Sequence, residues 1–352
     1  IYKIIVDELE NIKKKFHSPR KTRIEASGEE IEDEDLIAEE EMIVSVTHTG
    51  YIKRIPIDEY RLQKRGGKGL KGSGSRDEDF VWRIFSASTL TTLLVFSDRG
   101  KLYWLKVHRL PLGSRTFKGR AINNVINLSS GEKVKAILPV EKFTENSFVV
   151  MLTENGIIKK TSLSAFLRPR PSGIIALTTD LDDTVIESKI SSGQNDVFIV
   201  TREGMSIRFD ETDVRGMGRS ARGVKGITLG ENDKVIGMEV IDKNAIETIL
   251  IVTKGGFGKR TPLVEYRTQS RGGVGVITQK ITDKVGPVVA AQSVTDQDEI
   301  IISTNEGQAI RMKASEISVL GRNTQGVKLI DLKDQEYVTG FALVSEDDRE
   351  GE

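Results

Sequence analysis

The chain has no cysteine, and it has only eight prolines and few aromatic residues among 352 residues. Without cysteine it can form no disulfide and offers no cysteine-based metal site or nucleophile, which fits a cytoplasmic protein. No run of 18 apolar residues and no signal-like start occurs in the sequence. We therefore expect neither membrane insertion nor secretion.

Residue patterns typical of catalysis are also missing. The only histidines, His17, His48 and His108, are scattered, and no zinc-protease, phosphate-loop or triad-like pattern occurs. Carboxylates are plentiful, but none are paired at a spacing that suggests acid–base work. We predict a chain with no catalytic residues, no metal site and no cofactor of its own.

The formal net charge of zero hides an uneven distribution. Residues 29–41 hold nine acidic residues and no basic one, and residues 346–352 hold five acidic residues against one arginine. Without residues 1–41 and that tail, 44 basic residues face 34 acidic ones. This basic body predicts a polyanionic partner. The acidic ends either compete with that partner or serve as solvated linker and tail.

One pattern recurs six times at intervals of about 50 residues, which is typical of an array of blades. Each copy is a Thr or Ser, two further residues and a Gly, at positions 47–50, 97–100, 153–156, 201–204, 253–256 and 304–307. Before each copy lies an apolar run rich in β-branched residues, suited to a strand buried on both faces. We expect these strands to begin near Met42, Leu93, Phe148, Val197, Ile249 and Ile300.

Each glycine of this pattern suits a tight hairpin turn, so a second strand should follow directly. Four residues after the turn glycine, five of the six copies carry a basic side chain. The six residues are Arg54, Trp104, Lys160, Arg208, Arg260 and Arg311.

A second glycine follows the first after alternating intervals of 17 and 19 residues. These glycines are Gly67, Gly119, Gly173, Gly223, Gly273 and Gly326. Glycines alone can merely permit bends or bulges in a blade. Because Lys and Arg flank all six, we interpret each as part of a basic loop that meets the polyanion.

The N-terminal segment differs from the repeats. Ile4, Ile5, Leu9, Ile12 and Phe16 have helical spacing, and Ser18-Pro19 is a helix stop. We expect the end of a longer helix here. The predicted parts are residues 1–41 (helix end and acidic linker), residues 42–345 (six blades) and residues 346–352 (acidic tail).

The heptapeptide Gln63-Lys64-Arg65-Gly66-Gly67-Lys68-Gly69 closely resembles the gyrase-A box of the DNA gyrase A family. The six repeats resemble the C-terminal domain of that family. The resemblance implies an all-β, six-bladed β-pinwheel with strands exchanged between neighbouring blades. It also implies non-specific binding, bending and wrapping of duplex DNA, which lets gyrase introduce negative supercoils, and a box that ties the first blade to the last.

The same resemblance implies the partners. They are double-stranded DNA, the breakage–reunion domain of gyrase A, and gyrase B; ATP and Mg²⁺ belong to other domains, and the isolated domain is expected to be a cytoplasmic monomer. The DNA-cleaving tyrosine domain has no counterpart here, so we expect no cleavage. Two alternatives remain: a topoisomerase IV C-terminal domain, against which the intact box and six repeats argue, and a protein-interaction or enzymatic propeller, which needs no basic loop in every repeat.

The predicted DNA-binding residues combine the box with basic residues of the repeats, because lysine, arginine and glycine backbone amides can contact phosphates without reading sequence. They are Gln63, Lys64, Arg65, Gly66, Gly67, Lys68, Gly69, Arg54, Lys118, Arg120, Lys160, Arg168, Arg170, Arg219, Arg222, Lys225, Arg260, Arg271, Arg322 and Lys328.

Overall fold

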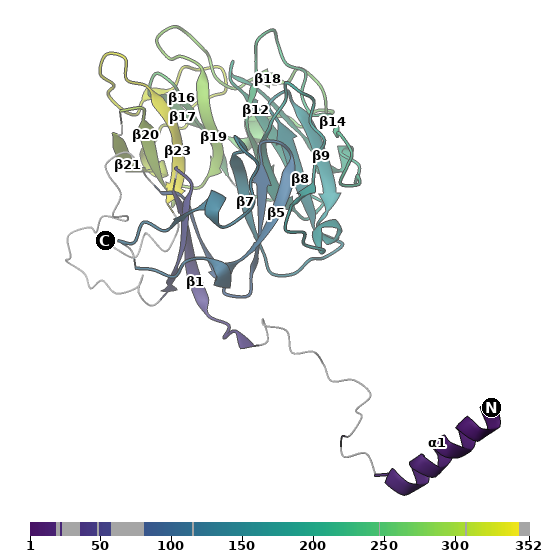
Figure 1. Cartoon of the computed structure of the whole chain (residues 1–352). Helices are drawn as coiled ribbons and strands as arrows, with labels where there is room; N and C mark the ends of the chain where they lie inside the picture. The colour runs from purple at the N-terminus through teal and green to yellow at the C-terminus, as the bar shows by residue number, and fades with distance from the viewer. Residues whose placement is uncertain are drawn as a thin grey trace. The chain divides into compact units, whose positions relative to one another are not determined.

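The computed structural model describes residues 1–18, 22, 36–47, 49–57, 81–114, 116–245, 247–306 and 308–344. The chain divides into two units, Ile1–Ile37 and Ala38–Glu352. The first unit contains helix α1 (Tyr2–Phe16), where the apolar spacing predicts it, and all its residues are exposed (Figure 1). No helix in the described part of the chain is long and apolar enough to cross a membrane.

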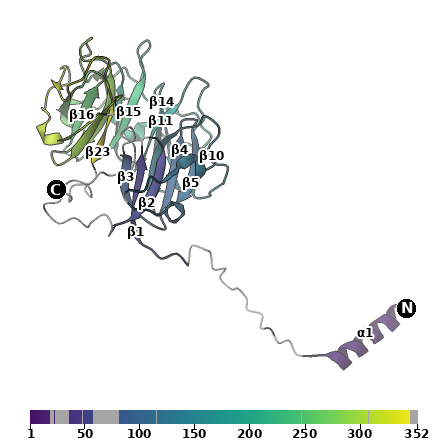
Figure 2. The same cartoon turned by 60° about the vertical axis from the view of Figure 1, so that its left-hand side comes forward.

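The second unit consists of six antiparallel β-sheets arranged as the blades of a propeller (Figures 1 and 2). In every blade a hairpin forms the middle of the sheet. The hairpins are β1 (Glu41–Thr47) and β2 (Tyr51–Pro56), β4 (Thr92–Ser97) and β5 (Lys101–Lys106), β8 (Phe148–Thr153) and β9 (Ile157–Ser162), β12 (Asp196–Thr201) and β13 (Met205–Asp210), β16 (Thr248–Thr253) and β17 (Phe257–Pro262), and β20 (Glu299–Thr304) and β21 (Ala309–Lys313). The predicted fold class is confirmed, and every first strand begins within one residue of its expected position.

The repeated Thr/Ser-x-x-Gly pattern forms the hairpin turn. In the third repeat the Gly156 amide donates to the Thr153 carbonyl (3.0 Å), and the Thr153 hydroxyl accepts from the Ile157 amide (3.1 Å). Gly156 has φ of 82°, a left-handed conformation that glycine adopts without strain. The hydroxyl and the glycine therefore explain why both positions recur.

The first strand of each hairpin is apolar throughout because it packs against a blade on either side. In β4, Leu93 and Val95 join the apolar cluster shared with the first blade, whereas Leu94 and Phe96 join the cluster shared with the third. Alternating side chains point to opposite faces of a strand, so each face fills one gap between blades. The same arrangement repeats along the described blades, and the core is a set of layers between neighbouring sheets.

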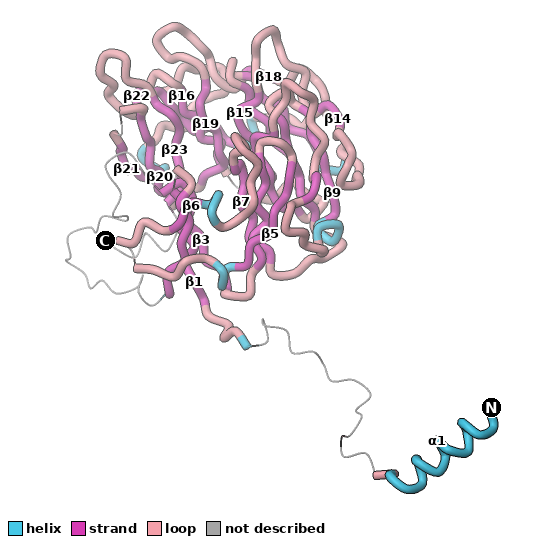
Figure 3. The backbone as a smooth tube through the Cα atoms, in the orientation of Figure 1, coloured by secondary structure: helices cyan, strands magenta, loops and turns pink. Residues whose placement is uncertain are grey.

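Each blade has an inner strand that contacts the inner strand of at least one neighbouring blade (Figure 3). These are β3 (Val81–Ser88), β7 (Val134–Val140), β11 (Val185–Ser191), β15 (Val235–Ile241), β19 (Val288–Val294) and β23 (Val338–Val344). They surround the axis of the propeller. The opposite edge of each sheet is therefore its outer rim.

The outermost strand of a blade comes from the next repeat, as the resemblance implies. These short strands are β6 (Arg120–Ala121), β10 (Ile174–Ile175), β14 (Val224–Lys225), β18 (Val276–Ile277) and β22 (Val327–Lys328). They complete the first to fifth sheets, and the sixth sheet has three strands among the described residues. The exchange links each blade to its successor.

The structure corrects the alternating glycine spacing. In four repeats, the glycine directly before the edge strand has a positive φ. A Cβ on this glycine would collide with a carbonyl of the preceding repeat, that of the residue two positions after the turn glycine. The equivalent in the fifth repeat is Gly275, not Gly273, because a Cβ on Gly275 would lie 2.2 Å from the Ser206 carbonyl oxygen. The interval there is 19 residues, so the strict alternation was wrong.

Candidate nucleic-acid interface

In the second to sixth repeats a loop connects the hairpin to the exchanged edge strand. We name the described residues of these segments the rim loops: 110–114 with 116–119, 167–173, 214–223, 266–275 and 317–326. Each begins after a 3₁₀ turn, respectively η2 (Val107–Arg109), η4 (Leu163–Phe166), η5 (Glu211–Asp213), η6 (Leu263–Glu265) and η7 (Ala314–Glu316). Because each loop leads into an outermost strand, all five lie on the rim.

Most predicted basic residues of these loops and edge strands are exposed. The exposed set is Lys118, Arg120, Arg168, Arg170, Arg222, Lys225 and Lys328. Arg222 pairs with Asp180 at 3.0 Å with 73% of its side chain exposed, and Lys328 pairs with Asp331 at 2.7 Å. Such exposed pairs contribute little stability, so both cations can exchange their carboxylate for a phosphate.

Three predicted residues are half-buried and take part in hydrogen bonds between consecutive repeats, Arg271 and Arg322 through their side chains and Arg219 through its carbonyl. The Arg271 guanidinium donates to the carbonyls of Asp213 (3.2 Å) and Lys225 in the preceding repeat. Arg322 donates to the Ile277 carbonyl (3.2 Å), and the Arg219 carbonyl accepts from a buried lysine. These residues thus combine charge at the rim with contacts between consecutive repeats.

In the first five repeats the side chain four residues after the turn glycine donates to the next repeat, whereas Arg311 of the sixth repeat is exposed and pairs with Glu299 of its own hairpin at 2.6 Å. The side chains of Arg54, Lys160 and Arg260 donate to the carbonyls of Leu110 (3.1 Å), Glu211 (3.0 Å) and Ile317 (3.1 Å) respectively, at the 3₁₀ turn of the next repeat. Trp104, the one non-basic member of the series, does the same toward Phe166 at 2.8 Å. The shared property is therefore a long side chain with an N–H donor.

Lys160 and Arg260 are almost fully buried, at 6% and 4% exposure. Lys160 lies 3.6 Å from the carboxylate of Glu211, which is itself fully buried and accepts hydrogen bonds from Ser191 and Asn195. Arg260 pairs with Asp296. Geometry thus gives Arg54, Lys160 and Arg260 a role in joining repeats, and we leave them out of the proposed DNA surface.

Two exposed arginines of the rim loops were missed from the sequence. Arg215 and Arg267 follow the apolar residue that closes the 3₁₀ turn, as Arg168 does in the third repeat. The sequence contains a signal for them, which is an apolar residue four or five positions after the hairpin, followed by arginine. The predicted box residues 63–69 lie outside the described residues.

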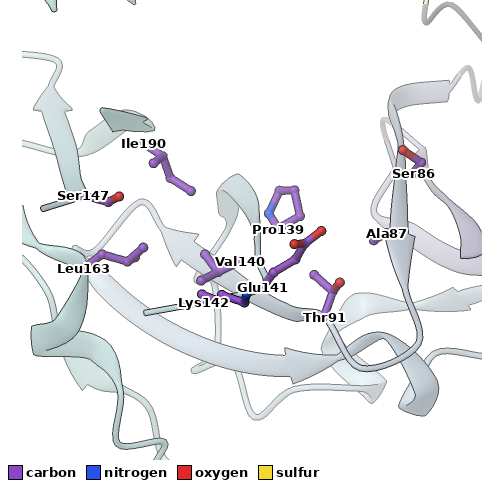
Figure 4. A pocket seen from close by; sticks show the side chains of 10 residues that line it. All are labelled: Ser86, Ala87, Thr91, Pro139, Val140, Glu141, Lys142, Ser147, Leu163 and Ile190. Carbon is purple, nitrogen blue, oxygen red and sulfur yellow. The ribbon is translucent and has the colours of Figure 1, made fainter. Parts of the chain in front are cut away.

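A cavity of about 300 Å³ lies between the inner ends of the first three blades (Figure 4). Pro139, Glu141 and Lys142 at the end of β7 line its middle, with Thr91 on one side and Ile190 on the other. Among the described residues no cluster of His, Asp and Glu could hold a metal ion.

Comparisons with known proteins agree with this geometry. The chain matches the family model described as DNA gyrase C-terminal domain, beta-propeller, over residues 41–84, 91–141, 147–189, 195–242, 247–295 and 298–345. It is 44% identical to the DNA gyrase A protein of Salmonella typhimurium over 352 residues, which is 99% of this chain and 40% of that protein. The chain therefore spans about two fifths of the length of the curated relatives it matches.

Two solved structures are similar to this propeller. A crystal structure of the C-terminal domain of DNA topoisomerase IV matches with a TM-score of 0.77 and 27% identity, covering 90% of this chain and 96% of that one. A DNA gyrase A C-terminal domain matches with a TM-score of 0.68 and 26% identity, covering 86% and 99%. The family model covers all six blades, and the chain belongs to the DNA gyrase A C-terminal domain family.

Proposed function

We propose that this chain binds duplex DNA without sequence preference and bends it around the outer rim of the propeller. The observation that carries the proposal is the repeated presence of exposed lysine and arginine side chains on the rim loops and edge strands. Basic side chains in a row contact phosphates, and phosphate contacts position DNA without reading its sequence.

The energy of bending explains why several loops are required. If DNA follows half a turn with its axis about 40 Å from the centre, the path is about 130 Å, or roughly 40 base pairs. Bending DNA with a persistence length of about 500 Å along this path costs on the order of 10 kcal/mol. The two or three phosphate contacts of one loop cannot offset that cost, whereas contacts from all the loops together can.

In the whole enzyme, this module would present the wrapped segment to the cleavage domain in a fixed crossing sense. The ATP-driven holoenzyme, in which the partners are gyrase B and the breakage–reunion domain of gyrase A, can then introduce negative supercoils. The curated relatives are gyrase A proteins, components of a type IIA topoisomerase, and this chain corresponds to their C-terminal part. On this reading it has no catalytic step of its own and acts by shaping DNA.

The structural likeness to a topoisomerase IV domain does not separate that alternative from gyrase, since both domains share the fold. The curated relatives, which are gyrase A proteins along 99% of the chain, favour gyrase. The protein-interaction alternative predicts no salt-dependent binding of plain DNA.

Binding of a plain duplex of about 40 base pairs, followed by fluorescence anisotropy at increasing salt, tests the proposal. About eight phosphate contacts predict a log–log slope near −7, and duplexes of unrelated sequence should bind equally well. Absence of binding at low salt, or an affinity insensitive to salt, would refute it.

A second experiment concerns the box. Replacing residues 63–69 by alanine removes three cations and the glycines that allow close backbone approach to phosphates. Short duplexes should still bind through the remaining loops, whereas a long duplex should lose its bend. In reconstituted gyrase the variant should lose negative supercoiling and keep ATP-independent relaxation. Undiminished bending of the long duplex would exclude the box from wrapping.

A further inference from the structure

Three lysines are almost completely buried beneath the rim loops, three residues after the turn glycine in alternate blades. Lys53, Lys159 and Lys259 are 3%, 0% and 0% exposed. No sequence pattern described above includes these three lysines. A buried ammonium is costly unless its hydrogen bonds are satisfied, so their partners decide what they do.

For each lysine the partners include backbone carbonyls of a rim loop from the following repeat. Lys53 Nζ donates to the carbonyls of Ser114 (3.3 Å) and Phe117 (2.7 Å) in the loop of the second repeat. Lys159 Nζ donates to the carbonyl of Arg219 in the fourth repeat, and to Ala176 at 2.5 Å.

Lys259 makes the fullest set of contacts. Its Nζ donates to the carbonyls of Gly321 (2.8 Å), Arg322 and Thr324 (3.2 Å), and to the Thr324 hydroxyl (3.0 Å), all in the loop of the sixth repeat. Carbonyls four residues before the edge glycine, those of Arg219 and Arg322, are bound in two of the three loops. Three lysines thus hold corresponding stretches of three basic loops.

The neighbouring blades show that the propeller does not need a lysine at this position. Tyr103 and Ile207 occupy the same strand position in the second and fourth blades, where they are 2% and 0% exposed. An uncharged side chain therefore packs between the same kinds of elements. What the lysine adds is specific hydrogen bonding to a loop backbone.

We propose that Lys53, Lys159 and Lys259 are positioning residues for DNA binding, which hold the rim loops of the second, fourth and sixth repeats so that their cations face the phosphates. The inference rests on the proposed function. Lys118, Arg219 and Arg322 would be the cations held in this way, because their own or an adjacent carbonyl binds the buried ammonium.

The pH dependence of DNA binding distinguishes a positioning role of these lysines from a purely structural one. Burial lowers the pKa of Lys159 and of Lys259 to about 8; for Lys259, Glu265 acts in the opposite direction and Arg322 in the same direction. Burial also lowers the pKa of Lys53. A neutral amine has two N–H donors instead of three, so above pH 8 Lys259 cannot keep all its hydrogen bonds to the loop, and the bonds of Lys159 and Lys259 lose the charge that strengthens them.

The test compares the full chain with a variant carrying Lys53→Met, Lys159→Met and Lys259→Met. A matched control carries Lys133→Met, Lys142→Met and Lys333→Met, which removes the same charge from exposed sites outside the rim loops. Binding and bending of a duplex of about 40 base pairs are measured by energy transfer, per folded molecule, from pH 7 to 9.5. We expect about tenfold weaker binding for the buried-lysine variant at pH 7, with a salt slope smaller by about 2 to 3, and near-parent binding for the control.

The parent should lose affinity as pH rises through about 8, and the buried-lysine variant should show no such loss. Failure of the parent itself to bind DNA would refute the proposed function. Parent binding with an unaffected buried-lysine variant would refute this inference alone. If the triple variant does not fold, Lys159→Met alone and the pH profile of the parent decide, and a flat parent profile would overturn the inference.

Discussion

Basic side chains of the strands and basic side chains of the rim loops come from the same repeats but have different surroundings. Lys159, Lys160 and Arg260 lie on hairpin strands, are at most 6% exposed and donate to carbonyls of the following repeat. Arg168 and Arg222 lie on loops and are exposed. The charge of these residues in the sequence does not distinguish the buried group from the exposed group.

The difference indicates a division of labour. A buried cation needs nearby acceptors, and in a ring of exchanged strands the nearest free carbonyls belong to the loops and turns of the next blade. A loop cation keeps its solvent and can release it to bind phosphate. Buried cations of the hairpin strands therefore join the blades, and exposed cations of the rim loops and edge strands are left for DNA.

The largest expected effect comes from removing a strand cation. Lys160→Ala leaves the fully buried Glu211 carboxylate without its ammonium, which should cost about 3 kcal/mol of the free energy of unfolding. Urea denaturation measures it. The variant Lys225→Ala, at an exposed position of the edge strand β14, should change that free energy by less than about 0.5 kcal/mol. Equal stability losses in the two variants would abolish the distinction.

The converse variant removes loop charge. Arg168→Ala with Arg170→Ala should leave stability nearly unchanged, because both side chains are exposed. The salt slope of duplex binding should shrink by about 2, and affinity at moderate salt should fall about tenfold. A double variant at the exposed Lys133 and Lys142 is the control of equal charge. The same loss in that control would mean that net charge, and not the rim, governs binding.

The buried lysines should also give stability a characteristic pH dependence. The ordinary pKa is 10.5 and the folded-state pKa of Lys159 and Lys259 is about 8, so between these values the unfolded chain holds protons that the folded protein has released. The free energy of unfolding should therefore rise with pH across this window, by on the order of 1 kcal/mol per lysine. Urea denaturation of the parent and of Lys159→Met with Lys259→Met at pH 7.5 and 10 measures it. If the free energy of unfolding of the variant rises as much between pH 7.5 and 10 as that of the parent, these lysines do not cause the rise.

The smallest effect concerns the acidic ends. Deleting residues 29–37, which precede the propeller unit, or residues 346–352 should tighten DNA binding up to a few-fold at low salt, because tethered carboxylates compete with phosphates for the basic surface. The gain should disappear as salt shortens the screening distance to about 10 Å at 0.1 M. Equal affinities at low ionic strength would make these segments simple spacers.

Much of the fold was predictable because each repeat contains the local sequence patterns that determine its turn and its strands. The Thr153 hydroxyl and the positive φ of Gly156 define a hairpin that a sequence pattern reveals directly. The strand starts follow from apolar runs that must be buried on both faces. Glycine alignment in the fifth repeat failed because Gly272, Gly273 and Gly275 lie close together, and only the approach to the Ser206 carbonyl identifies Gly275.

The site was less predictable, since exposure depends on which element comes next in space. Lys160 and Arg168 are both basic residues of the third repeat, yet one meets Glu211 of the fourth repeat and the other meets solvent. Trp104 was the available clue: an indole at the same position offers an N–H but no charge. The presence of tryptophan where the other repeats have arginine or lysine fits a hydrogen bond within the protein and not a phosphate contact.

Wrapping itself is tested most directly by DNA topology. Nicked circles are closed by ligase in the presence of increasing amounts of the protein, and the linking number is read after the protein is removed. We expect a linking difference that grows with bound protein, keeps one sign, and shrinks in the Arg168→Ala and Arg170→Ala variant. Circles whose linking number stays unchanged at saturating protein would contradict wrapping around the rim.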